Sequence, residues 1–241
     1  MIKEIKEKGN IPTHLAVIMD GNRRFARQLG LEEESGHMKG REKLEEMLDW
    51  CTELGVEILT VYAFSTENFR RDSKEVRNLM KLFKKNFRKA AEDERVHDKE
   101  VKIQAIGNIE ELPSDVKESI SYAEEKTKDY DNYFFNIAVG YGGRQEIVQA
   151  IQKVAEEVKR GELEVEDINE KVFANRLYTS DFPDPDLILR TSGEERISNF
   201  LLWQSAYSEL YFTDVYWPGF RKIDFLRAVR SYQNRKRRKG E

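Results

Sequence analysis

Six polar residues near the start of the chain have the types and the spacing of an anion-binding turn. They follow an apolar run at residues 15–19 and are Asp20, Gly21, Asn22, Arg23, Arg24 and Arg27. Asp, Gly and Asn form tight turns and helix N-caps, helix N-termini attract anions, and arginine forks bind phosphate oxygens in pairs. Asp20 would repel a bound anion unless a divalent cation lay between them. The turn therefore predicts a diphosphate site with Mg²⁺ held by Asp20, and the alternative is a strand–turn–helix with a solvated basic face.

Three further polar segments come directly after predicted strands. They lie at residues 65–71, 140–144 and 190–198, and each contains arginine together with small or hydroxyl residues. In an open α/β sheet, ligands bind outside the carboxyl ends of the strands. A solvated surface would spread arginines over both rims of a sheet. Their presence on one rim favours a polyanionic ligand, large enough to carry two diphosphates.

Strands and helices are expected to alternate along the chain and to position these segments. Strands are expected at residues 15–19, 56–64, 101–107, 133–139, 187–190 and 209–216. Helices are expected after Gly36 as far as Gly55, at about 72–90, 114–128, 147–158 and 200–206, and from about residue 223. This alternation predicts an α/β fold with a mostly parallel six-stranded sheet flanked by helices. With no repeat or linker in 241 residues, we expect a single domain over 1–241.

Composition excludes several classes of protein. A net charge of −4 argues against a general nucleic-acid binder. Cys51 is the only cysteine and the three histidines are scattered, so neither a disulfide framework nor a zinc site is expected. No apolar run approaches the roughly 18 residues of a membrane span, which favours the cytoplasm and leaves peripheral membrane contact open. The nucleotide motifs are incomplete, since Gln145 stands where the dinucleotide fingerprint has its last glycine.

Five ordered motifs resemble those of the cis-prenyltransferases, the undecaprenyl diphosphate and dehydrodolichyl diphosphate synthases. They lie at residues 14–26, 36–40, 61–71, 136–144 and 190–204. The resemblance runs from about residue 11 to the C-terminus. It implies an enzyme that condenses isopentenyl diphosphate in cis onto an allylic diphosphate. The product would be a long-chain polyprenyl diphosphate, the precursor of a glycosyl carrier lipid.

The resemblance also implies roles for individual residues. Asp20 and Asn68 would be catalytic, and Asp20 and Glu209 would contact Mg²⁺. Allylic substrate would be bound by Gly21, Asn22, Arg23, Arg24, His37, Ser65, Phe69 and Arg71. Isopentenyl diphosphate would be bound by Arg190, Arg196, Ser198, Arg238 and Gly240. The segment from Arg238 to Gly240 fits an element that reaches across a dimer interface, which implies a homodimer.

Some questions stay open at this point. Bacterial members usually carry glycine in place of Arg23 and arginine near Glu33, so this chain resembles archaeal and eukaryotic members more closely. The primer is farnesyl or geranylgeranyl diphosphate, and the product length is open. A growing apolar chain needs a hydrophobic tunnel. The apolar stripe from Val76 to Phe87 is either its wall or ordinary core.

Two other function classes remain as alternatives. One is a non-catalytic partner subunit of the same fold, against which Asp20, the arginine rim and the C-terminal Arg238 and Gly240 argue. The other is an RNA-binding α/β protein that uses the basic tail, for which binding would weaken steeply with salt.

Overall fold

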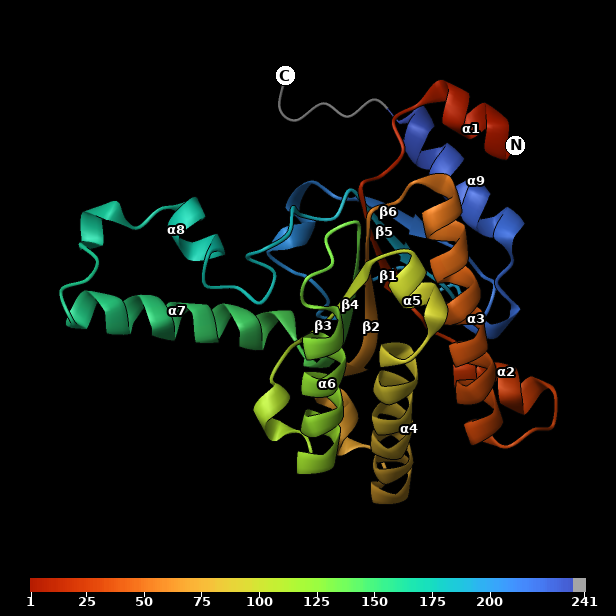
Figure 1. Cartoon of the computed structure of the whole chain (residues 1–241), viewed down its shortest axis with the longest axis horizontal. Helices are drawn as coiled ribbons and strands as arrows, with labels where there is room; N and C mark the ends of the chain where they lie inside the picture. The colour runs from red at the N-terminus through yellow and green to blue at the C-terminus, as the bar shows by residue number, and fades with distance from the viewer. Residues whose placement is uncertain (236–241) are drawn as a thin grey trace.

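A parallel sheet lies at the centre of the structure (Figure 1). The computed structural model describes residues 1–235, and within them the sheet has six strands. The strands are β1 (His14–Ile18), β2 (Ile58–Ser65), β3 (Val101–Ile106), β4 (Tyr133–Tyr141), β5 (Leu187–Arg190) and β6 (Glu209–Phe212). Their spatial order is β3-β4-β2-β1-β5-β6, and every neighbouring pair is parallel. The expected α/β sheet is confirmed and is parallel throughout.

Helices and short 3-10 turns connect the strands. The α-helices are α1 (Ile2–Lys8), α2 (Asn22–Gln28), α3 (Glu33–Leu54), α4 (Ser73–Ala91), α5 (Glu94–Asp98), α6 (Ser114–Thr127), α7 (Gly143–Lys159), α8 (Glu170–Ala174) and α9 (Lys222–Asn234). The 3-10 helices are η1 (Thr66–Arg70), η2 (Ile109–Glu111), η3 (Val165–Asp167), η4 (Gln204–Tyr207) and η5 (Trp217–Gly219). In Figure 1, α7 and α8 stand to one side of the sheet, and α1 packs beside α9.

The sheet is buried on both faces, as the near-continuous apolar runs of its central strands require. Leu15 and Val17 of β1 belong to a large core that also contains residues of α3, α4, α6 and α9. Ala16 and Ile18 point to the other face and belong to a smaller core with Phe200. The alternation along one strand therefore joins two cores through the sheet.

The chain reverses its direction of winding at β1. It proceeds from β1 to β2, β3 and β4 on one side of the sheet and later returns to place β5 and β6 on the other. Ile18 is aligned with Tyr62 of β2 and with Arg190 of β5, so the segments that follow these strands emerge at one edge. This is the topological switch point at which open α/β sheets bind ligands.

Several expected elements differ in extent. Strand β2 begins at Ile58 and β6 ends at Phe212, and α3 already begins at Glu33. The helix expected at residues 200–206 is reduced to the short η4, because Ser198, Asn199 and Leu201 have φ angles of 46°, 64° and 44°. Left-handed residues cannot continue a right-handed helix, so this apolar segment enters the smaller core as a turn.

Candidate active site

The main chain of Asp20 is held in place from two sides. Its N–H donates to Thr191 Oγ1 at 3.0 Å, and the Thr191 hydroxyl donates to the carbonyl of Asp20 at 2.7 Å. The main-chain N–H of Trp217 donates to the same carbonyl at 3.0 Å. Gly21 follows with a φ of 101°, and a Cβ there would lie 2.7 Å from Tyr216 Cδ1. Only glycine fits this left-handed, crowded position.

The Asp20 carboxylate contacts two arginines. Its Oδ2 accepts from Arg190 Nη2 at 2.8 Å, and its Oδ1 lies 3.2 Å from Arg24 Nη2. Burial raises the pKa of Asp20, but hydrogen bonds from Arg190 and Ser192 and the charges of Arg190 and Arg24 outweigh it. The pKa of Asp20 is therefore held below its usual value. The carboxylate is charged at neutral pH and, with 31% of its surface exposed, can reach a ligand.

Arg190 connects Asp20 to the loop that follows β5. Only 4% of the Arg190 side chain is exposed. Its Nη1 donates to Ser198 Oγ at 2.6 Å and to the carbonyl oxygen of Arg196, while the Arg196 side chain points outward and pairs with Glu194. The structure thus brings Arg190 and Ser198 to the Asp20 turn, together with the backbone of Arg196.

Arg24 is held by the same loop. Its Nη2 donates to Ser192 Oγ at 2.7 Å, and its Nη1 donates to Glu194 Oε1 at 3.2 Å. Ser192 and Glu194 are site residues that the sequence analysis did not single out. Their signal was present, because both lie in the arginine-rich segment after β5.

A second carboxylate, that of Glu75 near the start of α4, lies close to Arg71, Arg23 and His37. Arg71 Nη1 donates to Glu75 Oε1 at 2.9 Å, and Arg23 Nη1 lies 3.7 Å from Glu75 Oε2. His37 Nε2 is 4.0 Å from Glu75 Oε1, which is too long for a hydrogen bond. Burial and the nearby Arg71 lower the pKa of His37, so its imidazole is neutral at pH 7.

The two departures from the bacterial pattern contact each other. Glu33 Oε2 accepts from Arg23 Nε at 2.6 Å, and Glu33 Oε1 accepts from Arg27 Nη2 at 2.6 Å. Hydrogen bonds from Arg23 and Arg27 outweigh burial and lower the pKa of Glu33. An arginine at position 33 would repel Arg23, so an arginine at position 23 favours an acidic residue at position 33.

These groups line a polar pocket that opens into an apolar cavity. The residues around the polar pocket are Met19, Asp20, Gly21, Asn22, Arg23, Arg24, Arg27, His37 and Arg71. Met19, Asn22 and His37 also line the apolar cavity, which has a volume of about 210 Å³. Among the described residues, Asp20 is the only acidic one that lines the polar pocket. The site therefore combines an arginine-rich polar pocket with an adjoining apolar cavity.

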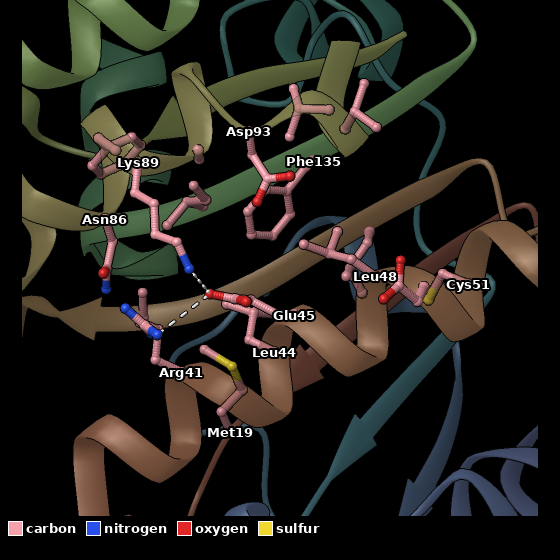
Figure 2. Close-up of a pocket in the computed structure, with 18 of the residues that line it drawn as sticks. Met19, Arg41, Leu44, Glu45, Leu48, Cys51, Asn86, Lys89, Asp93 and Phe135 are labelled. Carbon is pink, nitrogen blue, oxygen red and sulfur yellow. Dashed lines mark hydrogen bonds and ion pairs between the residues drawn. The ribbon is translucent and has the colours of Figure 1, made fainter. Parts of the chain in front are cut away.

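The apolar cavity runs beneath α3 and α4 along the sheet (Figure 2). Its lining extends from Met19, after the carboxyl end of β1, to Glu57, before the amino end of β2. Phe83 and Phe87 of the apolar stripe on α4 line it. An apolar cavity thus lies beside the stripe, whose residues Leu79 and Phe87 line it and also belong to the core.

Ser65 and Asn68 form a cap at the start of η1. Ser65 N–H donates to Asn68 Oδ1 at 3.1 Å, which closes a cap at the start of η1, and Arg71 follows directly at its end. Phe69 is partly buried and packs edge-on against Phe64 of the core, with ring centroids 4.8 Å apart. Phe69 is not among the residues that line the polar pocket, and its contact with substrate stays a prediction.

The structure separates Glu209 from Asp20 within one chain. Glu209 is aligned with Leu187 at the amino end of β5, three residues before Arg190. At about 3.3 Å per residue, three residues span roughly 10 Å along the strand. Glu209 also forms an ion pair with Arg235. Within one chain Glu209 and Asp20 therefore lie at different ends of the strands, and the contact of Glu209 with Mg²⁺ stays a prediction.

The predicted contacts of Arg238 and Gly240 lie outside the described residues. Within residues 1–235, no three His, Cys, Asp or Glu side chains come together as a metal-binding group. Any metal in the polar pocket would therefore need ligands beyond Asp20.

The family is decided by comparison with known proteins. The prenyltransferase family model described as "Putative undecaprenyl diphosphate synthase" matches residues 18–240 of the chain. The chain belongs to this family of cis-prenyltransferases. The resemblance seen in the five sequence motifs is thereby confirmed.

Archaeal relatives of this cis-prenyltransferase are similar over its whole length. The proteins of Methanocaldococcus jannaschii and Picrophilus torridus are each 56% identical across 100% of the chain, which covers 87% and 94% of them, respectively. Both are named tritrans,polycis-undecaprenyl-diphosphate synthase (geranylgeranyl-diphosphate specific). The expected likeness to archaeal members is confirmed.

Solved structures have the same fold. Lavandulyl diphosphate synthase from Lavandula x intermedia, in complex with dimethylallyl diphosphate, superposes with a TM-score of 0.92 at 38% identity, covering 96% of this chain and 99% of that one. A probable undecaprenyl diphosphate synthase from Campylobacter jejuni superposes with a TM-score of 0.79 at 35% identity, covering 97% and 100%.

Proposed function

We propose that this cis-prenyltransferase adds isopentenyl diphosphate units to geranylgeranyl diphosphate and makes a long-chain polyprenyl diphosphate, the precursor of a glycosyl carrier lipid. One observation carries the proposal: Asp20 and Arg190 meet directly at a cationic pocket that opens into an apolar cavity. Such a site can hold two diphosphates and an apolar tail. The choice of primer is supported by the relatives at 56% identity, which are named geranylgeranyl-diphosphate specific.

The arginines have a direct task in the reaction. The double bond of isopentenyl diphosphate attacks the allylic carbon, the carbon–oxygen bond to the diphosphate breaks, and a proton is lost from the added unit. Negative charge grows on the leaving diphosphate, where Arg23, Arg24 and Arg71 can donate charge-assisted hydrogen bonds. In the structure these three arginines are paired with Glu33, Glu194 and Glu75. We infer that the incoming diphosphate replaces these carboxylates.

The site fits Mg²⁺ held jointly with the substrate. Mg²⁺ is usually bound by one or two carboxylates plus substrate phosphates, and Asp20 supplies one ionised, partly exposed carboxylate among arginines. When bound, the ion would stabilise the charge that develops on the departing diphosphate. Arg190 keeps Asp20 charged and oriented before substrate arrives.

A homodimer is also part of the proposal. Strand β6 is an edge strand of the described sheet, and α7 stands away from the body of the molecule (Figure 1). On α7, Val148 and Ile151 are 54% and 53% exposed. Free sheet edges and exposed apolar faces are typical of interfaces. We expect sedimentation velocity to show that the parent protein is a dimer. The double variant Val148→Asp and Ile151→Asp should be a monomer. A monomeric parent protein would contradict the proposal.

We place the enzyme in the cytoplasm. Because its product is apolar, we also expect peripheral contact with the membrane. Over residues 1–235, none of the helices has the length and apolar character that crossing a membrane requires. Flotation with lipid vesicles in the presence and absence of product tests the contact.

A competition between primers tests the proposed substrate. Equal concentrations of farnesyl and geranylgeranyl diphosphate are supplied with limiting labelled isopentenyl diphosphate, and the products of the two primers are separated by mass. We expect label to enter mainly geranylgeranyl-derived chains. A preference for farnesyl diphosphate would overturn the primer assignment and leave chain elongation intact.

A further inference from the structure

Asn199 joins three of the segments that follow the strands at the carboxyl edge of the sheet. Its main-chain carbonyl accepts from Gly143 N–H at 2.7 Å, and its Oδ1 accepts from Arg144 N–H at 2.9 Å. These two N–H groups belong to the first residues of α7, which begins shortly after β4. Asn199 Nδ2 donates to Glu67 Oε1 of η1 at 3.0 Å and to Gln145 Oε1 at 3.2 Å. One side chain therefore ties the loop after β5 to the segments that follow β4 and β2.

The backbone at this junction is left-handed. Ser198 and Asn199 have φ angles of 46° and 64°. Residues other than glycine persist in this region where the surrounding structure holds them, and they cluster at functional sites. Asparagine adopts the left-handed conformation more readily than most residues. Position 199 therefore carries a residue type that suits both the backbone and the three side-chain hydrogen bonds.

The residues just before Asn199 are those that the family resemblance assigns to isopentenyl diphosphate. Ser198 Oγ accepts from Arg190 Nη1 at 2.6 Å, and the carbonyl oxygen of Arg196 accepts from the same nitrogen. A shift of Asn199 would move Ser198 and the backbone of Arg196 relative to the Arg190 guanidinium.

The two halves of the loop after β5 have different anchors. In the first half, Ser192 N–H donates to the carbonyl of Val215 at 2.9 Å, and Gly193 N–H donates to the carbonyl of Thr213 at 2.8 Å. The second half, residues 196–199, is tied to α7 and η1 through its last residue. Phe200 follows and is buried in the smaller core. Loss of the side chain at position 199 should therefore loosen the second half, while the first half and Phe200 keep the fold.

The other end of the junction is next to a predicted catalytic residue. Glu67 directly precedes Asn68 in η1. Burial raises the pKa of Glu67, but hydrogen bonds, including the one from Asn199, outweigh burial and hold this pKa below its usual value. The Glu67 carboxylate is charged at neutral pH, so residue 199 has to present a hydrogen-bond donor to it.

We propose that Asn199 is a positioning residue that holds Ser198 and the backbone of Arg196 at a fixed place relative to Asn68. It would thereby place isopentenyl diphosphate against η1, and it acts through the loops that it joins. The proposal rests on the proposed function, since it requires isopentenyl diphosphate as a substrate.

Asn199→Gly removes the side chain and leaves the left-handed backbone accessible. Three side-chain hydrogen bonds are lost, so the KM for isopentenyl diphosphate should rise roughly tenfold. The KM for geranylgeranyl diphosphate should stay within about twofold, because Arg24 keeps its contact with Ser192 in the separately anchored first half. An unchanged KM for isopentenyl diphosphate, or equal rises in both KM values, would overturn the proposal.

The matched control is another asparagine at the start of a helix. Asn169 Oδ1 accepts from Val172 N–H at 3.0 Å and caps α8, which lies away from the sheet (Figure 1). Asn169→Gly removes a comparable cap. We expect it to leave both KM values unchanged, so a selective rise in Asn199→Gly reports on the junction and not on the loss of a helix cap in general.

An exchanged pair tests the contact with Glu67 directly. Asn199→Asp keeps an acceptor for Arg144 N–H and sets a second carboxylate against Glu67, so the KM for isopentenyl diphosphate should rise. Adding Glu67→Gln supplies a donor on the opposite side and should reverse most of that rise. Adding Glu67→Gln to Asn199→Gly should not.

General weakening of the fold cannot be repaired by one specific exchange, so failure of the Asn199→Asp and Glu67→Gln pair to recover would also overturn the proposal. Failure of the parent enzyme to incorporate isopentenyl diphosphate with any primer would instead refute the proposed function.

Discussion

Replacing Asp20 by asparagine removes one charge and leaves the shape of the side chain almost unchanged. In the native site one carboxylate oxygen accepts from Arg190 at 2.8 Å and the other lies 3.2 Å from Arg24. An amide has only one acceptor oxygen, so its NH₂ group must face one of the two guanidinium groups as donor against donor. Asp20→Asn therefore breaks one arginine contact and weakens the other.

The structure sets the size of both effects. Arg190 is buried with 4% exposure, but its Nη1 keeps Ser198 as a partner. The loss of one charged hydrogen bond at such a group costs about 1–3 kcal/mol of folding stability. Asp20 is the only acidic residue among the described residues around the polar pocket. Loss of a preorganised electrostatic group lowers turnover by roughly 10²–10³-fold.

Two measurements separate these effects. Incorporation of labelled isopentenyl diphosphate is followed while Mg²⁺ is titrated, and unfolding is followed in denaturant. Glu194→Gln is the matched control, because Glu194 contacts Arg24 at 3.2 Å from outside the polar pocket; it should retain turnover within about tenfold. Turnover of Asp20→Asn within about tenfold of the parent enzyme at every Mg²⁺ concentration would refute the role given to Asp20.

Three further predictions concern the same site. The pKa of Asp20 is lower in the folded protein than in the unfolded chain, where it is about 3.9. The charged carboxylate therefore stabilises the fold fully above the unfolded pKa, and this stabilisation is lost as the pH falls through the folded pKa. The difference in unfolding free energy between the parent protein and Asp20→Asn should shrink below about pH 4. Gly40→Ala should cost about 1–3 kcal/mol in denaturant unfolding and reduce turnover, because its Cβ would lie 2.2 Å from Asn22 Oδ1; full activity would contradict this. Glu33→Ala releases Arg23 for the diphosphate, so the KM for the primer should fall several-fold while kcat stays the same, and a raised KM would argue against carboxylate exchange.

Much of this site could be predicted from the sequence because it lies at strand ends. Asp20 and Arg190 each follow or end a short buried apolar strand, and only a covered parallel sheet accounts for several such strands in turn. In a parallel sheet these ends share one edge, and the structure brings the two side chains into contact there. The clustering of arginine on one rim was therefore readable from spacing alone.

The carboxylates that hold the arginines were not predicted. Glu33 and Glu75 begin helices, and glutamates in a first turn are common for reasons of helix stability alone. Their contacts with Arg23 depend on how α3 and α4 sit beside the Asp20 turn, which is a matter of tertiary packing.

The helix expected at residues 200–206 is wrong for a physical reason. Residues 200–206 are apolar enough for a helix, but the left-handed backbone of Asn199 and Leu201 prevents one.

The proposed function requires this chain to elongate geranylgeranyl diphosphate with isopentenyl diphosphate at the Asp20–Arg190 site, with Mg²⁺. Mass analysis of products formed from these two substrates, with Mg²⁺ and again with a chelator, tests it most directly. We expect long polyprenyl diphosphates spaced by five-carbon units with Mg²⁺, and unextended primer with the chelator. Unextended primer under both conditions, or full-length products in the presence of the chelator, would contradict the claim.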